Sequence, residues 1–293
     1  VKGRSLREAT RIRERFAYDH LSVLRVCKHY QVTRQAYYKS QTRDLINRFD
    51  REKLHMLVME SRKELPREGG HKLYKRIRPK LQQMGIKVGR DMLFTFLGNE
   101  GLLVKPKKSF VKTTNSYHRF NIYSNLISSN APRGINQVWV SDITYVQTHQ
   151  GFMYLALITD AYSRKIVGYD ISKSLELSGC MRVLKMALRQ LPKAHQLIHH
   201  SDRGIQYCSN AYIELLKQNK VQISMAAKGN CYENAMAERV NGILKDEFYL
   251  DQNFKTTDIA IKNTRQAVNL YNNVRTHMAI GYVTPNEKHN NAA

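Results

Sequence analysis

The sequence predicts an α/β fold in which a mixed five-stranded sheet is flanked by helices and preceded by a basic, all-helical, helix-turn-helix-like N-terminal region. Three observations support this prediction. The chain of 293 residues is long enough for one large domain or two modest ones. Residues 1–130 hold 29 Lys and Arg against 11 Asp and Glu, whereas the remaining residues hold 19 against 13. Apolar residues recur at helical spacing in the first half and form short β-branched runs in the second.

The N-terminal half is predicted to be helical. Leu21–Lys39 has helical apolar spacing, a break near Gln31, and Thr33 as the N-cap of a basic, tyrosine-bearing helix. This is the outline of a helix-turn-helix. Three further helices are predicted at Lys53–Lys63, His71–Met84 and Arg90–Leu97. Pro79 is placed to divide the second of these.

The helix His71–Met84 is a candidate DNA-binding element. Within ten positions it carries five basic residues and no acidic one: Lys72, Lys75, Arg76, Arg78 and Lys80. A helix face that is merely solvated usually mixes both signs of charge. We therefore expect DNA contacts from these side chains, with a solvated charged helix as the alternative.

Residues 102–134 are predicted to be a linker, because Pro and Gly punctuate a polar stretch. They separate the helical DNA-binding region, residues 1–101, from a second domain, residues 135–293. In that domain apolar runs predict five strands: Val138–Val146, Phe152–Thr159, Lys165–Ile171, Leu197–Ser201 and Val221–Met225. Helical periodicity predicts four helices: Leu175–Leu191, Asn210–Asn219, Glu233–Phe248 and Asp258–Asn272.

The order of these elements predicts the sheet topology. Three consecutive strands suit an antiparallel meander, and the strand–helix alternation that follows suits parallel strands added beside it. A mixed five-stranded sheet with flanking helices is the ribonuclease-H-like arrangement.

The net charge of +24 and the pI near 9.9 predict an anionic partner, for which nucleic acid is the usual one. A membrane-surface protein and a merely basic soluble protein are the alternatives. The four cysteines are scattered without zinc-ligand spacing, which favours reduced thiols and a cytoplasmic location. No apolar run approaches the ~18–20 residues of a membrane span, and no signal peptide is visible.

Three carboxylates are distinguished by their context. Asp142 lies inside the strand word VWVSDITY, Asp202 follows the strand word LIHHS, and Glu238 lies in the helical word CYENAMAERVNGILK. A carboxylate within an apolar strand is costly to bury unless it is paired or binds a cation, and ligands collect at strand ends in α/β sheets. Each one alone is also compatible with a salt-bridged or capping role. Together they can supply oxygen ligands for two Mg²⁺ ions acting on a phosphodiester, and Mn²⁺ accepts the same ligands.

The helix around Glu238 is predicted to have two distinct faces. Four residues recur at intervals of four, three and four and share one face: Asn234, Glu238, Asn241 and Lys245. Four others can face the core: Ala235, Val240, Ile243 and Leu244. Lys245 lies about 10 Å along the axis from Glu238, well placed for a DNA phosphate. A solvated lysine is the alternative.

The words WVSDITY, HSDRGIQY, KGNCYENAMAE and YNNVRTHMAIGYVTP closely resemble the transposases encoded by the second reading frame of the IS-three family of bacterial insertion sequences. Asp142 and Asp202 are separated by 59 residues, and Asp202 and Glu238 by 35. The second interval resembles the spacing in the DDE transposase and retroviral integrase superfamily. The resemblance covers residues 135–286 strongly and residues 20–130 loosely.

This resemblance implies a ribonuclease-H-like integrase catalytic core that cleaves DNA strands at element ends and joins them, using a 3′-hydroxyl in DNA integration and recombination. It implies that Asp142, Asp202 and Glu238 are the catalytic, metal-binding residues. Glu233 competes for the third position by proximity, but it matches the acidic position of the CYEN word instead. Further DNA contacts are expected near the carboxylates from Lys245, Asn234, Asn241, Arg203 and Lys228.

The resemblance also implies partners. We expect double-stranded DNA, both terminal repeats and target, and a homodimer or higher oligomer, because two DNA ends are joined. The additional, upstream helix-turn-helix and leucine zipper that the family's first frame usually encodes are not evident, and the chain begins at Val1 rather than Met. An upstream-frame protein or a fusion with it is therefore a further expected partner, and the expected location is the bacterial nucleoid.

Two rival functions remain open at this stage. A ribonuclease-H-like nuclease or junction resolvase would hydrolyse DNA without joining it. A DNA-binding relic of a transposase, acting as a repressor, would lack catalysis, although all three carboxylates are intact.

Overall fold

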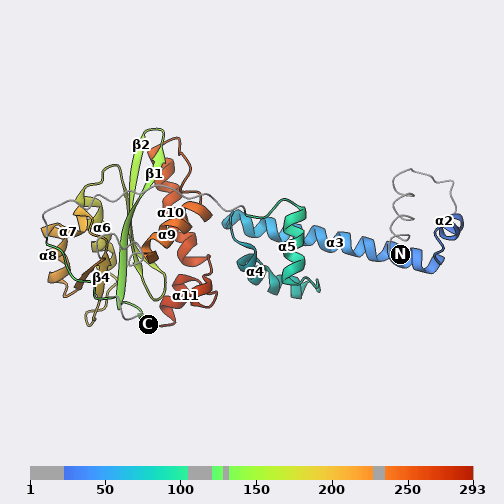
Figure 1. The fold of residues 1–293 in the computed structure, drawn as a ribbon, viewed down its shortest axis with the longest axis horizontal. Coiled ribbons are helices and arrows are strands. Elements are labelled where there is room, and N and C mark those ends of the chain that lie inside the picture. Colours follow the sequence, from blue (N-terminus) through green and yellow to red (C-terminus); the bar gives the residue numbers. More distant parts are fainter. Residues whose placement is uncertain (1–22, 105–120, 128–131, 227–234, 293) are drawn as a thin grey trace. The chain divides into compact units, whose positions relative to one another are not determined.

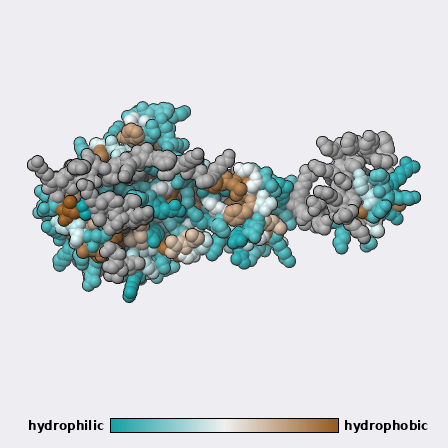
Figure 2. Space-filling model, in the orientation of Figure 1, coloured by the Kyte–Doolittle hydropathy of each residue, from teal (hydrophilic) through white to brown (hydrophobic). Residues whose placement is uncertain are grey.

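The computed structural model describes residues 23–104, 121–127, 132–226 and 235–292. The chain packs as two compact units, one formed by Val1–Ser61 with Arg76–Gly89 and the other by Arg62–Lys75 with Arg90–Ala293. The predicted domain boundaries at residues 101 and 134 stay predictions. On the face shown in Figure 2, hydrophilic residues cover most of the described surface. Among the described helices, none is both long and apolar enough to cross a bilayer.

A five-stranded sheet forms the centre of the larger unit (Figure 1). Its strands are β1 Val138–Thr148, β2 Gly151–Asp160, β3 Ile166–Ser172, β4 Ile198–Ser201 and β5 Gln222–Met225. They lie in the order β3-β2-β1-β4-β5. The first three strands pair antiparallel, and β4 and β5 continue the sheet in parallel from β1. This confirms the predicted ribonuclease-H-like topology.

Helices cover both faces of the sheet, because successive side chains of β2 enter two different cores. Leu155 and Leu157 pack with side chains of α9 (Ala235–Glu247) and α10 (Thr257–Asn273). Ala156 and Ile158 pack with side chains of α6 (Leu177–Leu188) and α8 (Asn210–Gln218). Figure 1 shows these two pairs of helices on opposite sides of the strands. Burial on both faces explains the nearly continuous apolar run of β2. The helices of this part of the chain are α6 Leu177–Leu188, α7 Ile205–Cys208, α8 Asn210–Gln218, α9 Ala235–Glu247, α10 Thr257–Asn273, the 3₁₀ helix η2 Met278–Ile280 and α11 Pro285–Asn290.

The N-terminal part is helical, as predicted, and its first helices are separated where the sequence indicates. Gln31 adopts a φ of 52°, and the Thr33 hydroxyl accepts a hydrogen bond from the Ala36 N–H at 3.1 Å. The predicted break and N-cap are therefore confirmed. The described N-terminal helices are α2 Val23–His29, α3 Arg34–Glu64, α4 Gly70–Gln83 and α5 Arg90–Asn99.

Two details of the N-terminal prediction are wrong. No separate helix begins at Lys53, because α3 runs for 31 residues and neither Gly nor Pro interrupts it. Pro79 does not divide α4, although it removes one helical hydrogen bond. The apolar face of α4 continues across the proline, with Leu73, Ile77 and Leu81 all buried, and this packing keeps both halves helical.

Part of the predicted linker packs against the sheet. The Leu126 N–H donates to the Ser224 hydroxyl at 2.9 Å. Tyr123 packs against the cluster formed by Cys208, Ile213 and Met225. Residues 121–127 therefore lie beside the edge strand β5, an attachment that their polar composition did not indicate.

Candidate active site

Asp142 and Asp202 are brought together by the pairing of two parallel strands. Ser141 of β1 lies in register with Ser201 of β4. Each aspartate is the next residue after one member of this pair, and Asp202 directly follows the carboxyl end of β4. The two predicted carboxylates therefore lie side by side at the strand end where ligands collect in α/β sheets.

The carboxyl group of Asp142 has a strongly perturbed pKa. Burial and then the charge of Asp202, with a smaller effect from Glu238, raise it to about 7. Two hydrogen bonds act in the opposite direction: the Ile143 N–H donates to Oδ1 at 2.9 Å and Asn241 Nδ2 donates to Oδ2 at 2.8 Å. The balance leaves a carboxylate whose negative charge lacks compensation, which is the condition that a bound cation relieves.

The turn after β4 orients Asp202. Its Oδ1 accepts a hydrogen bond from the Gly204 N–H at 2.9 Å. Arg203 Nε donates to the Ala226 carbonyl at 2.8 Å, at the end of the segment that contains β5. Arg203 was predicted to contact DNA. In the described structure its side chain links the turn after β4 to residue 226, and a DNA contact stays a prediction.

Glu238 lies in the first turn of α9 and is exposed. Its charge reaches Asp142, since it contributes to the raised pKa of that group. Within the described ranges, however, no three Asp, Glu, His or Cys side chains are close enough to hold a metal ion together. The role of Glu238 as third ligand therefore stays a prediction. Lys228, Glu233 and Asn234 lie outside the described residues.

Two of the predicted polar residues of α9, Asn241 and Lys245, lie near Asp142. Asn241 is buried and bonds Asp142, so its amide orients the carboxylate, and a DNA contact from it stays a prediction. Burial lowers the pKa of Lys245 while the charge of Asp142 raises it, which brings the lysine within the electrostatic reach of the site.

The core face of α9 is largely as predicted. Val240, Ile243 and Leu244 are buried, but Ala235 is exposed and Ala237 takes the expected place in the core. Ala235 precedes Val240 by five positions, so the two lie about 140° apart around the helix at ~100° per residue. The prediction for Ala235 is therefore wrong.

The basic residues of α4 have different surroundings. Lys72 pairs with Glu247 at 2.9 Å, Lys75 lies 3.9 Å from the centre of the Tyr282 ring, and Lys80 pairs with Glu60 at 3.4 Å. Arg76 is partly buried and Arg78 is exposed. DNA contacts from these five side chains stay predictions.

A buried polar network beneath Asp142 was missed by the sequence analysis. The Ser141 hydroxyl and the Tyr212 hydroxyl both lie within hydrogen-bond distance of His199 Nε2, at 2.9 and 3.0 Å. Burial lowers the pKa of His199 to about 3, so the ring stays neutral. The network joins β1, β4 and α8 directly behind the two aspartates. The only signal in the sequence is a histidine inside an apolar strand.

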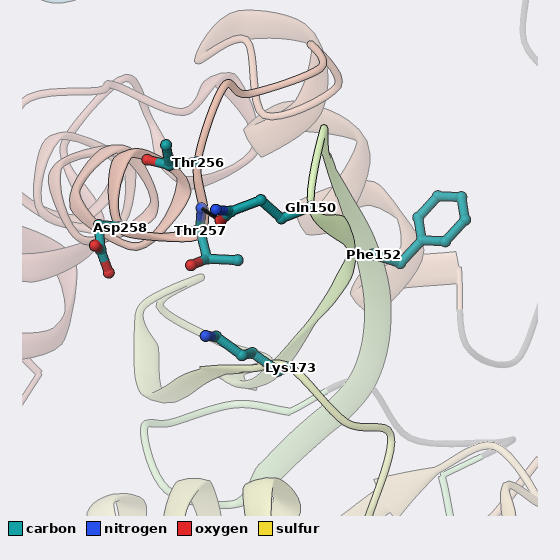
Figure 3. Close-up of a pocket in the computed structure, with 6 residues that line it drawn as sticks. All are labelled: Gln150, Phe152, Lys173, Thr256, Thr257 and Asp258. Atoms are coloured by element: carbon teal, nitrogen blue, oxygen red, sulfur yellow. Dashed lines mark hydrogen bonds between the residues drawn. The ribbon is translucent and has the colours of Figure 1, made fainter.

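An open hollow of about 430 Å³ lies away from these residues, at the β1–β2 turn and the start of α10. Figure 3 shows the side chain of Gln150 pointing at Thr257, whose backbone N–H donates to Gln150 Oε1 at 2.9 Å. None of the three predicted catalytic carboxylates lines this hollow. The candidate site is thus defined by the aspartates and α9 rather than by a cavity.

Comparison with known proteins connects this geometry to a family. Two models, both described as "Integrase core domain", match residues 132–231 and 219–285. The chain is 41% identical over 215 residues to the "Insertion element IS600 uncharacterized 31 kDa protein" of Shigella sonnei, covering 72% of this chain and 78% of that protein. It is 31% identical over 217 residues to "Transposase InsF for insertion sequence IS3A" of Escherichia coli K12, covering 73% and 75%. It is 32% identical over 230 residues to "Transposase for insertion sequence element IS629" of Shigella sonnei, covering 77% of each.

Solved structures also resemble the chain. The integrase catalytic core domain of HTLV-2 in complex with magnesium, in its trimeric form, matches with a TM-score of 0.42 and 18% identity, covering 53% of this chain and 96% of that one. The simian T-cell lymphotropic virus intasome in complex with the PP2A regulatory subunit B56 gamma matches with a TM-score of 0.47 and 18% identity, covering 75% and 74%.

Proposed function

The chain belongs to the transposases of the IS3 family and carries their integrase core, and from this premise we propose that Asp142, Asp202 and Glu238 carry out cleavage and joining of DNA strands at the ends of an insertion sequence. One observation carries the proposal. Asp142 and Asp202 follow registered residues of two parallel strands, and burial, together with the charge of Asp202, raises the pKa of Asp142 to about 7. Neighbouring carboxylates with perturbed pKa values are typical of catalytic sites.

The residues fit a divalent metal with oxygen ligands. Asp142 and Asp202 supply hard carboxylate oxygens, and the uncompensated charge of Asp142 favours a cation. We propose Mg²⁺, with Mn²⁺ able to replace it, held by Asp142 and Asp202 and completed by Glu238 from α9. Such ions, when bound there, would supply polarisation of the scissile phosphodiester and stabilisation of the charge on its oxygens.

The chain's own residues hold and orient the reacting groups. Asn241 fixes one oxygen of Asp142, and the Gly204 N–H fixes one oxygen of Asp202. Glu238 is exposed in the first turn of its helix, so its carboxylate is accessible to DNA and metal. Lys245, partly buried near Asp142, is proposed to bind a DNA phosphate beside the site.

The proposed partner is double-stranded DNA, first the terminal repeats and then the target. The excess of Lys and Arg in residues 1–130 supports a DNA-binding role for the N-terminal region. We further propose that the chain forms a dimer or higher oligomer on DNA, because two DNA ends are joined. It is also proposed to associate with an upstream-frame protein and to act on the nucleoid in the cytoplasm.

The proposal is tested by strand joining of a labelled element-end duplex with Mg²⁺. Wild type is compared with Asp202→Asn and with Glu214→Gln, an exposed carboxylate on α8 that serves as a matched control. We expect joined product from wild type and Glu214→Gln and none from Asp202→Asn. Cleavage without joining would favour a ribonuclease-H-like nuclease. DNA binding without either reaction would favour a transposase-derived DNA-binding protein that has lost catalysis.

A further inference from the structure

Glu247, at the C-terminal end of α9, is the centre of an ion-pair cluster. Arg275 donates to both of its oxygens, from Nε at 2.8 Å and from Nη2 at 2.7 Å. Lys72 Nζ donates to Oε1 at 2.9 Å. The three partners come from α9, from the segment after α10, and from the basic helix α4, and they are separated by up to 203 positions in the chain.

The cluster is shielded from water. The side chains of Arg275, Glu247 and Lys72 are only 4%, 16% and 17% exposed, whereas Lys80 and Glu60 in their surface pair are 56% and 62% exposed. Burial raises the pKa of Glu247, but the bonds and charge of Arg275 and the charge of Lys72 outweigh it and lower the net pKa. The pKa of Lys72 is lowered by burial and by Arg275, because the two cations share one carboxylate. Removing Glu247 would leave two shielded cations without their carboxylate, whereas removing Lys72 would leave the Glu247–Arg275 pair and break the ion pair between α4 and the end of α9.

Neighbouring contacts extend the cluster into a broader attachment. Arg67 Nη1 donates to the Asp246 carbonyl at 3.3 Å, and its guanidinium lies 4.3 Å from the centre of the Tyr249 ring. Lys75 stacks on Tyr282. The basic segment Arg67–Lys75 is thus held by the end of α9 and by the segment that follows α10, and its cations are directed at protein groups.

The position of Glu247 gives the cluster a consequence for catalysis. It lies nine residues after Glu238 on one helix, about 13 Å along the axis at ~1.5 Å per residue. A helix of this length moves as a rigid rod, so fixing its end restricts the direction of its first turn. We propose that Glu247 is a positioning residue for α9 and that Lys72 belongs to this cluster rather than to the DNA-binding surface.

The effect on Glu238 rests on the proposed function, but the cluster itself does not, so the test uses two measurements that need no catalysis. Backbone hydrogen exchange over Ala235–Glu247 is measured in the 293-residue chain without DNA. The salt dependence of duplex DNA binding is measured in parallel, since each phosphate contact contributes roughly 0.9 to the slope of log K against log salt. The variants are Lys72→Met, the conservative Lys72→Arg, and Arg78→Met as an exposed control on the same helix.

We expect Lys72→Met to raise exchange in the last turns of α9 about tenfold and to leave the salt slope unchanged. Lys72→Arg should restore slow exchange, and Arg78→Met should not change it. A slope that falls by about 0.9 in Lys72→Met would assign the lysine to DNA and overturn the proposal, as would exchange that stays at the wild-type rate. Failure of wild type to join strands would count against the proposed function alone.

Discussion

Asp142 combines two properties that a solvated aspartate lacks: a neighbouring carboxylate and a donor amide that holds one of its oxygens. Because the folded state raises the pKa of Asp142 to about 7, from an ordinary value of 3.8, it binds this proton more tightly than the unfolded chain does. The stabilisation of the folded state by this bound proton is fully present below the unfolded pKa and is lost as the pH rises through about 7. At neutral pH and above, the buried charge of Asp142 therefore destabilises the metal-free folded state.

The first prediction concerns this destabilisation by the Asp142 charge. Asp142→Asn removes the charge, and Asn241 Oδ1, buried without a partner among the described residues, can accept a hydrogen bond from the new amide after a flip. We expect the variant to unfold at a temperature about 2 °C or more above wild type at pH 8 without metal, and to lose that advantage at pH 4. Calorimetry at the two pH values measures it. An advantage that is equal at both would show that Asp142 does not titrate in this window.

The second prediction isolates the Asn241 amide. Its hydrogen bond lowers the pKa of Asp142 against the effects of burial and Asp202. Asn241→Ala should therefore move the pH midpoint of strand joining upward and weaken Mg²⁺ binding about 10–100-fold, the usual effect of losing a group that orients a metal ligand. A Mg²⁺ titration of joining at several pH values tests this. An unchanged midpoint with reduced activity would assign Asn241 a different role.

At the scale of elements, periodicity predicted the five strands and the helices α6, α8, α9 and α10 within a few residues, because apolar burial sets both patterns. The topology followed from their order. The short helices α7, η2 and α11 were not predicted. Contacts between distant segments were not predictable in this way. The attachment of residues 121–127 to β5 and the pairing of Lys72 with Glu247 both depend on which surfaces meet in three dimensions.

The third prediction uses two glycines in different packing environments. A Cβ on Gly168 of β3 would lie 2.6 Å from the Val183 carbonyl oxygen of α6, whereas one on Gly242 of α9 meets nothing within 4 Å. Gly168→Ala should force the helix off the sheet and destabilise the fold by about 1–3 kcal/mol. Gly242→Ala should stabilise it by about 0.5–1 kcal/mol, because alanine favours the helix. Urea unfolding of both variants gives the two signs. Stabilisation by Gly168→Ala would contradict the tight packing of α6 on β3.

At the scale of the whole molecule, the spacing of the carboxylates and their sequence words predicted the family, and the strand register brings Asp142 beside Asp202. What the sequence could not specify is which charges are already satisfied within the protein. Lys72 and Lys80 look alike in the sequence, yet Lys72 is shielded with Glu247 and Lys80 is half exposed. Burial, which depends on the tertiary fold, separates them.

The fourth prediction follows from the uneven distribution of the net charge of +24 along the chain. If the exposed cations of α4 bind DNA phosphates, the double variant Arg78→Gln, Lys80→Gln loses two phosphate contacts. The slope of log K against log salt for DNA binding should then fall by about 1.8. The matched variant Lys217→Gln, Lys220→Gln removes two exposed lysines, one in the last turn of α8 and one two residues after it, and should change the slope by much less. Fluorescence anisotropy over a series of salt concentrations measures both. Equal loss in the two variants would mean that DNA responds to the total charge of the molecule, and the basic helix would then have no special part in binding.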